Sequence, residues 1–245
     1  MERMVELSRR MQAVADMVSD KNRVCDVGCD HGYVSIYLVQ SGRSPFALAM
    51  DVNEGPLLKA KEHVRRYGVE SYITLRLSDG LSAYRIGEAD SLICAGMGGR
   101  LLLKILAKEP EKTADFKELI LQPQSEIALF RKTLRENGYV FLKEDMIFEE
   151  GKLYPLMKVK KAGRDEEQSE EKSKEQQEME DLLGPYLLKT KNPVLFRFIE
   201  RELSMKKEIL STLYSQKEND RTTARKRELE REIALLEKAE MTGRV

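Results

Sequence analysis

A glycine-spaced loop near the start of the chain could hold a small ligand. Residues 24–35 read VCDVGCDHGYVS, with Gly28 and Gly32 on either side of Asp30 and with Asp26 ahead of the first glycine. Glycines at this spacing allow a backbone to approach a nucleotide closely. A dinucleotide enzyme would place a pyrophosphate here, and the Asp30 carboxylate would oppose it. Two like unit charges about 4 Å apart repel by about 4 kcal/mol at an effective dielectric constant near 20.

A cationic ligand would reverse the sign of that interaction. S-adenosylmethionine carries a sulfonium and an ammonium group and no phosphate, yet its adenosine still needs a close backbone approach. We therefore expect Asp26 and Asp30 to face the ammonium and sulfonium side of this cofactor. The other loop residues expected to contact it are Gly28, Cys29 and Gly32.

Two further carboxylates follow the next two apolar stretches. Asp51 ends residues 46–51, about 20 residues beyond the loop, where an acidic group binds ribose hydroxyls. Asp79 and Gly80 follow residues 72–77, where a carboxylate can accept from the adenine amino group while a backbone amide donates to a ring nitrogen. Capping of a turn or helix is the alternative for any one aspartate. The remaining expected cofactor contacts are Val52, Ala95, Gly96 and Met97.

The expected cofactor-binding residues are far apart in the sequence, and a β-sheet could bring them together. Apolar stretches typical of buried strands alternate with stretches of helical periodicity. The expected strands are 23–27, 46–51, 72–77, 90–96 and 118–123, and the expected helices are 1–19, 32–42, 54–68, 101–108 and 125–138. Residues 139–150 and 152–160, joined at Glu150-Gly151, predict an antiparallel pair. The pattern indicates an α/β fold with a Rossmann-like, mostly parallel sheet and a terminal antiparallel hairpin, whose ligands bind at the carboxyl ends of the strands.

The composition changes after Lys161. Residues 165–180 contain eight acids and two lysines and almost no apolar side chain, which is typical of a solvated linker or a fraying helix. Helical periodicity returns at 193–216 and 222–239, and the break at Asn219-Asp220 predicts an antiparallel helical hairpin or coiled coil. The expected domains are a catalytic domain at 1–162, a charged linker at 163–180 and an α-helical coiled-coil domain at 181–245.

The overall composition limits the class of protein. The 245 residues include 42 Lys or Arg and 42 Asp or Glu, so nucleic-acid binding must come from local patches. No run of 18 apolar residues and no apolar signal core occurs, and we expect a cytoplasmic protein that does not contact a membrane. Three cysteines and two histidines suggest neither a disulfide framework nor a zinc site, so no metal is expected.

Five motifs together resemble a known family. VCDVGCDHGYVSIYLV, ALAMDVNEGPLLKA, LRLSDGL, ICAGMGG and LILQPQ are similar to the TrmK family, the bacterial tRNA (adenine-N1)-methyltransferases that modify adenine 22. The resemblance covers about residues 1–160. It implies a Rossmann-like methyltransferase with a C-terminal coiled coil that transfers a methyl group from S-adenosylmethionine to adenine N1 in tRNA. Asp30 replaces the middle glycine of the general D-x-G-x-G-x-G motif, a departure that the family shares.

The chemistry of adenine N1 suggests roles for two loop residues. This nitrogen has an in-plane lone pair and no proton, so the enzyme must align it with the methyl group and needs no general base. The product base is cationic, and a nearby carboxylate would stabilise it. Asp30 is the preferred catalytic candidate. His31 could bind the base or tune Asp30, with a locally satisfied helix residue as the alternative.

The sequence AGMGG at residues 95–99 follows the fourth expected strand. Enzymes that methylate exocyclic amines usually carry an Asn/Asp-Pro-Pro-Tyr-like sequence there, and its absence disfavours such a target. Gly96, Gly98 and Gly99 could instead provide a flat floor for a base. The alternative is a strand-to-helix turn that needs glycine only for its backbone geometry.

A target adenine inside folded tRNA must leave its stack at a cost of a few kcal/mol, so other contacts must hold the RNA. Residues 186–245 contain fourteen Lys or Arg against ten Asp or Glu. The cations expected to bind the tRNA are Arg9, Arg10, Arg100, Arg225 and Arg227. Ion pairs along a solvated helix are the alternative for the hairpin cations. Tyr33 could stack on a base or pack in the core, and His63 is expected at the surface.

The residues alone leave other activities open. A methyltransferase of this class could act on another RNA, on a protein or on a small molecule. A module that binds the cofactor and RNA without catalysis would show the same loop and the same basic hairpin. The choice of tRNA, and of the adenine within it, depends on the family resemblance.

Overall fold

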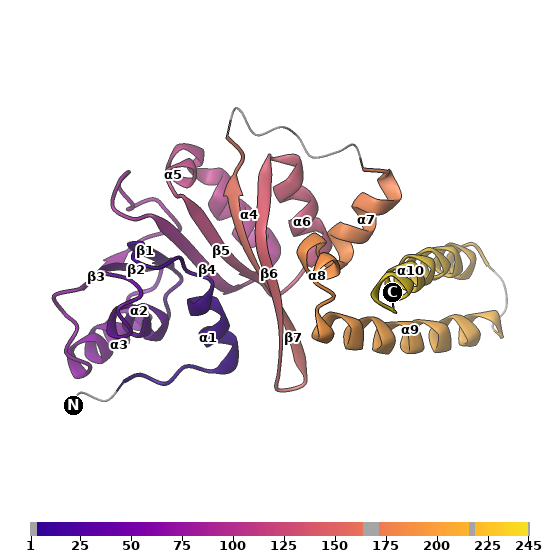
Figure 1. Ribbon diagram of the computed structural model, residues 1–245, viewed down its shortest axis with the longest axis horizontal. Helices are drawn as coiled ribbons and strands as arrows, with labels where there is room; N and C mark the ends of the chain where they lie inside the picture. The colour runs from indigo at the N-terminus through magenta and orange to yellow at the C-terminus, as the bar shows by residue number, and fades with distance from the viewer. Residues whose placement is uncertain (1–3, 164–171, 216–218, 245) are drawn as a thin grey trace. The chain divides into compact units, whose positions relative to one another are not determined.

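Two compact units make up the chain, residues 1–167 and 168–245. The computed structural model describes residues 4–163, 172–215 and 219–244 (Figure 1). No helix within these three ranges is long and apolar enough to cross a membrane.

The first unit contains one mixed sheet. Its strands are β1 (Val24–Val27), β2 (Ala47–Asp51), β3 (Ile73–Leu77), β4 (Ser91–Met97), β5 (Glu118–Pro123), β6 (Tyr139–Glu149) and β7 (Lys152–Lys161). Their order is β3-β2-β1-β4-β5-β7-β6. Strands β1 to β5 are parallel, and β7 is antiparallel to both β5 and β6. The predicted Rossmann-like sheet with an antiparallel hairpin at its end is confirmed.

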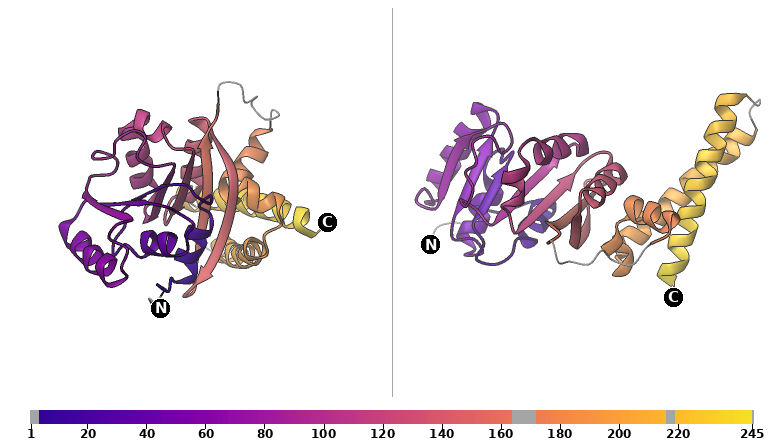
Figure 2. Two further views of the ribbon diagram at one scale, coloured as in Figure 1. Left: turned by 60° about the vertical axis from the view of Figure 1, so that its left-hand side comes forward. Right: turned by 90° about the horizontal axis from the view of Figure 1, so that it is seen from above.

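Helices cover this sheet in two groups. They are α1 (Arg9–Asp16), α2 (Tyr33–Gln40), α3 (Glu54–Arg66), α4 (Gly99–Lys108), α5 (Pro110–Ala114) and α6 (Ile127–Glu136). Helix α2 packs on α1 and α3, whereas α4 packs on α5 and α6 (Figure 2). The helix expected at 1–19 is shorter in the structure, because the Ser8 hydroxyl oxygen caps it by accepting from the Met11 amide at 3.3 Å.

The core explains the sequence pattern of the strands. Strands β1, β2 and β5 are buried along their whole length, as expected for a parallel sheet covered on both faces. On one face Cys25 packs with Leu102 of α4 and Phe130 of α6. On the other face Val24 packs with Val14 of α1. Both faces are therefore fixed by apolar packing, and the strand ends are left for polar functions.

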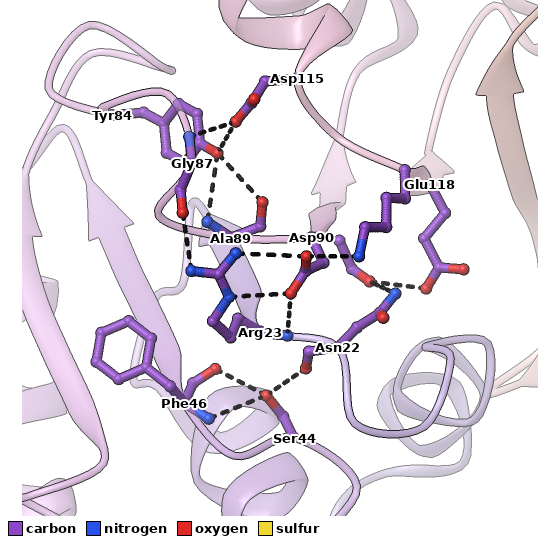
Figure 3. A network of polar contacts seen from close by, with 12 residues as sticks. Asn22, Arg23, Ser44, Phe46, Tyr84, Gly87, Ala89, Asp90, Asp115 and Glu118 are labelled. Atoms are coloured by element: carbon purple, nitrogen blue, oxygen red, sulfur yellow. Dashed lines mark hydrogen bonds and ion pairs between the residues drawn. The ribbon is translucent and has the colours of Figure 1, made fainter. Parts of the chain in front are cut away.

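A polar network joins the amino ends of the strands (Figure 3). The backbone N–H and Nε of Arg23 both donate to Asp90 Oδ2 at 3.0 Å, and Nη1 donates to the Gly87 carbonyl at 2.8 Å. The Gly87 amide and the Tyr84 hydroxyl donate to Asp115 at 2.7 and 2.5 Å. Hydrogen bonding from Arg23 holds the pKa of the Asp90 carboxyl well below its usual range. The polar groups at the amino ends of the strands are used in hydrogen bonds to one another. A ligand site is therefore expected at the carboxyl ends.

The second unit is helical. It contains α7 (Lys174–Leu183), α8 (Pro185–Lys189), α9 (Pro193–Tyr214) and α10 (Asp220–Arg244). Helices α9 and α10 pack against each other, as predicted for a helical hairpin (Figure 1). Residues 216–218, the end of the first expected helix and the start of the connection, lie outside the described residues.

Of the two alternatives for the acidic stretch at 165–180, a solvated linker or a fraying helix, the last part of the stretch is helical. Helix α7 occupies the last part of that range, because Ser173 caps its first turn and Leu183 is buried at its end. The composition of this stretch is acidic, but burial of one apolar side is enough to stabilise the helix. The first part of the predicted linker, residues 164–171, lies outside the described residues.

Candidate active site

A cleft of about 490 Å³ opens at the carboxyl ends of β1 to β4. The strand order reverses between β1 and β4, and ligands of open α/β sheets bind at such a position. The predicted site residues that line the cleft are Arg10, Asp26, Gly28, Cys29, Asp30, His31, Tyr33, Asp51, Val52, Asp79, Gly80, Ala95, Gly96 and Met97. Residues distant in the sequence therefore meet at one place.

The glycine loop is tied to the neighbouring strand. The Gly28 and Cys29 amides both donate to the Met50 carbonyl, at 2.8 and 3.0 Å. Gly28 has φ +73°, and a Cβ on it would lie 2.1 Å from the Met97 methyl carbon. Asp30, where the general motif has its middle glycine, has φ +49°, a region that aspartate tolerates better than most residues. Gly32 begins α2 at φ +75° and does not line the cleft, so its role is turn geometry.

Asp26 is a buried carboxylate on the floor of the cleft. Its side chain accepts a hydrogen bond from the Ser35 hydroxyl at 2.8 Å. Burial raises the pKa of Asp26 to about 6, although the Ser35 hydrogen bond acts in the opposite direction. A cationic ligand group beside this carboxylate would compensate for its desolvation.

The second strand places an acid and an apolar surface side by side. Asp51 is buried, and its Oδ1 accepts from the Asn53 amide at 2.9 Å while its Oδ2 accepts from the Asp30 amide at 3.4 Å. Val52 is 59% exposed at the cleft. A carboxylate next to an accessible apolar side chain suits a ribose with its attached base.

Asp79 has a partner that the sequence did not reveal. Lys108 of α4 donates to its carboxylate at 2.7 Å, and this hydrogen bond lowers the pKa of Asp79. An adenine amino group at this carboxylate would have to share it with Lys108. Gly80, with φ +60°, turns the chain against Ile105.

Asp30 and His31 lie at the mouth of the cleft. The Asp30 side chain is 69% exposed, and its Oδ1 lies 3.6 Å from His31 Nδ1. Both residues are therefore accessible to a group that enters from solvent. The fit to a cationic cofactor is good, since the described lining carries four aspartates and one arginine.

Arg10 lines the cleft and is held there by contacts with two strands. Its Nη1 donates to the Gln122 side chain at 3.1 Å, and its guanidinium lies 4.9 Å over the Tyr154 ring. Gln122 is fully buried and also accepts from the Gly96 amide at 3.0 Å. Gln122 lies in the motif LILQPQ, but neither it nor Tyr154 was predicted as a site residue, because no local pattern links β5 and β7 to this loop. Arg9, one residue earlier, is exposed on α1.

The expected glycine floor is reduced to one residue. Gly96 lines the cleft, but Gly98 caps α4 and Gly99 lies within it, and neither lines the cleft. A Cβ on Gly99 would lie 2.5 Å from the Ser125 carbonyl oxygen, so close backbone packing requires this glycine. Arg100 forms an ion pair with Glu126 and also lies outside the cleft lining.

Some cations of the helical unit are paired with acids, and others are exposed without such a partner. Arg225 forms an ion pair with Glu228, while Arg227 is exposed on α10. Lys226 is buried, with its Nζ 4.7 Å from the centre of the Tyr214 ring. Further ion pairs within this unit are Lys206–Glu232, Lys207–Glu237, Arg231–Glu178 and Lys238–Glu175. Among the residues that the structure describes, the side chains of Arg197, Arg201, Arg221 and Arg227 have no hydrogen-bond or ion-pair partner and remain available to an outside ligand.

Comparisons with known proteins identify the family. A family model described as a methyltransferase domain matches residues 7–157. A Bacillus subtilis (strain 168) tRNA (adenine(22)-N(1))-methyltransferase is 32% identical over 232 residues, which are 95% of this chain and 96% of that relative. The chain belongs to this methyltransferase family. The resemblance predicted from the motifs is confirmed, and it extends beyond the first 160 residues.

Solved structures agree in fold over both units. The crystal structure of the Bacillus subtilis m1A22 tRNA methyltransferase TrmK is 30% identical, with a TM-score of 0.82 over 96% of this chain and 99% of that chain. A Streptococcus pneumoniae structure in complex with S-adenosyl-L-methionine is 29% identical, with a TM-score of 0.79 over 96% of this chain and 100% of that chain.

Proposed function

We propose that this protein transfers a methyl group from S-adenosylmethionine to N1 of adenine 22 in tRNA. The observation that carries the proposal is a cleft lined by four aspartates, two buried and two exposed, in a chain of this family. Its partner is then tRNA. The expected substrate contacts outside the cleft lining, Arg9, Gly98, Gly99, Arg100, Arg225 and Arg227, are not needed for this conclusion.

The buried half of the cleft fits the cofactor. Asp26 would hold the ammonium group, since its carboxylate is desolvated and has a single neutral hydrogen-bond donor in Ser35. Asp51 would accept from the ribose hydroxyls, and Val52 would cover one face of the adenine. When bound, S-adenosylmethionine supplies an electrophilic methyl group, and the carbon–sulfur bond breaks as the new nitrogen–carbon bond forms.

The exposed half of the cleft fits the acceptor base. Asp30 would lie beside the adenine as N1 becomes positively charged, and its carboxylate would stabilise that charge. His31, whose Nδ1 lies 3.6 Å from Asp30 Oδ1, would contact the base beside that carboxylate. Neither residue has to remove a proton, because adenine N1 carries none.

The test is mass spectrometry of nucleosides from unmodified tRNA incubated with the protein and S-adenosylmethionine. We expect 1-methyladenosine with a natural tRNA and none when adenine 22 of the same tRNA is replaced by guanine. Absence of 1-methyladenosine, or equal amounts from both tRNAs, would contradict the proposal.

A further inference from the structure

Both histidines of the chain lie in one aromatic cluster beside the cleft. The Tyr33 and His63 rings stack with centroids 4.6 Å apart and planes 18° apart. His31 meets both rings edge-on, with centroid distances of 6.2 and 6.0 Å. The three rings come from the glycine loop, α2 and α3, and two of them also line the cleft. Three separate segments of the chain therefore form one aromatic surface.

Hydrogen bonds fix the orientation of the central ring. His63 Nδ1 lies 3.0 Å from the His31 carbonyl oxygen, and a carbonyl can only accept, so Nδ1 carries a hydrogen. In the neutral ring, Nε2 is then the acceptor for the Tyr33 hydroxyl at 3.3 Å. Tyr33 remains 37% exposed and His63 is half-buried, so the cluster is ordered and still accessible.

Exposed cations follow the same side of α3. Lys59 and Arg66 lie four residues before and three residues after His63, which places them on its side of the helix. Among the residues that the structure describes, neither side chain has a hydrogen-bond or ion-pair partner. Several cations of α9 and α10, such as Lys206, Lys207 and Arg231, are instead paired with acids. Two acids lie near this surface: Glu62 precedes His63 on α3, and the exposed Asp30 carboxylate lies 3.6 Å from His31.

We propose that this surface, defined by His31, Tyr33, His63, Lys59 and Arg66, binds the RNA strand next to the target nucleotide. The rings would stack on a nucleobase, and the two cations would bind its phosphates. An adenine that leaves its stack deprives its neighbour of a stacking partner, and the cluster at the cleft would replace that partner. The choice of RNA as the ligand rests on the proposed function.

The test measures binding of unmodified tRNA by fluorescence anisotropy with S-adenosylhomocysteine present, so no turnover is involved. We expect His63→Ala to raise the Kd about tenfold, while His63→Phe, which keeps a ring, stays within about threefold of the wild type. The double variant Lys59→Gln/Arg66→Gln should reduce the slope of log Kd against log salt by about 1.5, since it removes two phosphate contacts. Glu62→Gln should tighten binding.

The matched control is Lys61→Gln/Arg65→Gln, which removes the same charge from the opposite flank of α3. The inference is overturned if this control weakens binding as much as Lys59→Gln/Arg66→Gln does, or if His63→Phe binds as poorly as His63→Ala. Calorimetry with S-adenosylhomocysteine checks that each variant keeps its cleft. A wild type that binds tRNA through this surface without methylating adenine 22 would overturn only the proposed function. Unchanged tRNA binding in all variants would overturn only the surface.

Discussion

At the scale of single residues, the charge of Asp26 depends on the fold. Burial raises its pKa to about 6, whereas an aspartate in an unfolded chain titrates near 3.9. Between about pH 4 and pH 6 the folded chain therefore holds a proton that the unfolded chain releases. The stability that this group contributes is complete below about pH 4 and is lost as the pH rises through 6.

Folding favours the protonated form of Asp26, whereas a cationic ligand should favour the ionised form. If Asp26 binds the cofactor ammonium, the ionised carboxylate is required, and the Kd for S-adenosylhomocysteine should rise by about tenfold per pH unit below pH 6. Calorimetry between pH 5 and pH 8 measures this dependence. Asp26→Asn should bind more weakly at pH 8 and lose the dependence below pH 6. A wild-type Kd that is constant from pH 5 to pH 8 would disprove this role.

The Asp30 carboxylate is expected to act on catalysis more than on cofactor binding. Asp30→Asn should lower kcat by about 100-fold, the scale of one lost electrostatic contact to a developing charge. Asparagine tolerates φ +49° as aspartate does, so the loop should keep its shape. Single-turnover methylation of tRNA measures the rate, and calorimetry with S-adenosylhomocysteine serves as the control. Full activity in Asp30→Asn would remove this carboxylate from the mechanism.

At the scale of secondary-structure elements, the turn from β4 into α4 depends on close packing. A Cβ on Gly99 would lie 2.5 Å from the Ser125 carbonyl oxygen, whereas one on Gly98 would lie 3.1 Å from the Ser125 hydroxyl, which can rotate away. Gly99→Ala should therefore lower the free energy of unfolding by about 1–3 kcal/mol, and Gly98→Ala by less. Urea unfolding of both variants measures the difference, and equal losses would refute the packing argument.

At the amino ends of the strands, the contact between Arg23 and Asp90 is expected to contribute to stability. Arg23 joins the start of β1 to Asp90 by two hydrogen bonds of 3.0 Å. Asp90→Asn should lower the free energy of unfolding at pH 7 by about 1–2 kcal/mol. Because Arg23 lowers the pKa of the Asp90 carboxyl, its contribution is present above about pH 4 and is lost as the pH falls further. The gap between wild type and Asp90→Asn should therefore narrow in acid. A gap that stays constant down to pH 2 would contradict this.

Local sequence patterns were sufficient to predict the strands and most of the residues that line the cleft. Strands β1, β2 and β5 are short, mostly apolar stretches, and the acids at or near the ends of successive strands meet because parallel strands end at one edge. Contacts between distant segments were not predictable in this way. The Lys108 partner of Asp79, the Gln122 partner of Arg10 and the His63 stack on Tyr33 all join separate elements.

At the scale of the whole molecule, positive and negative side chains are distributed differently in the two units. The chain has no net charge, and many cations of the helical unit are balanced by acids within that unit. The cleft of the first unit is acidic, which favours a cationic cofactor and would oppose a diphosphate. Binding of RNA can then use exposed cations that have no acidic partner among the described residues, such as Lys59, Arg66, Arg201 and Arg227, and should weaken as the salt concentration rises.

The most direct measurement is calorimetric titration of the intact protein, first with S-adenosylhomocysteine and then, in a separate experiment, with a nicotinamide dinucleotide. The acidic cleft predicts binding of the first compound and no measurable binding of the second. Tight binding of the dinucleotide, with no heat from S-adenosylhomocysteine, would contradict the central claim that four aspartates shape this cleft for a methyl donor.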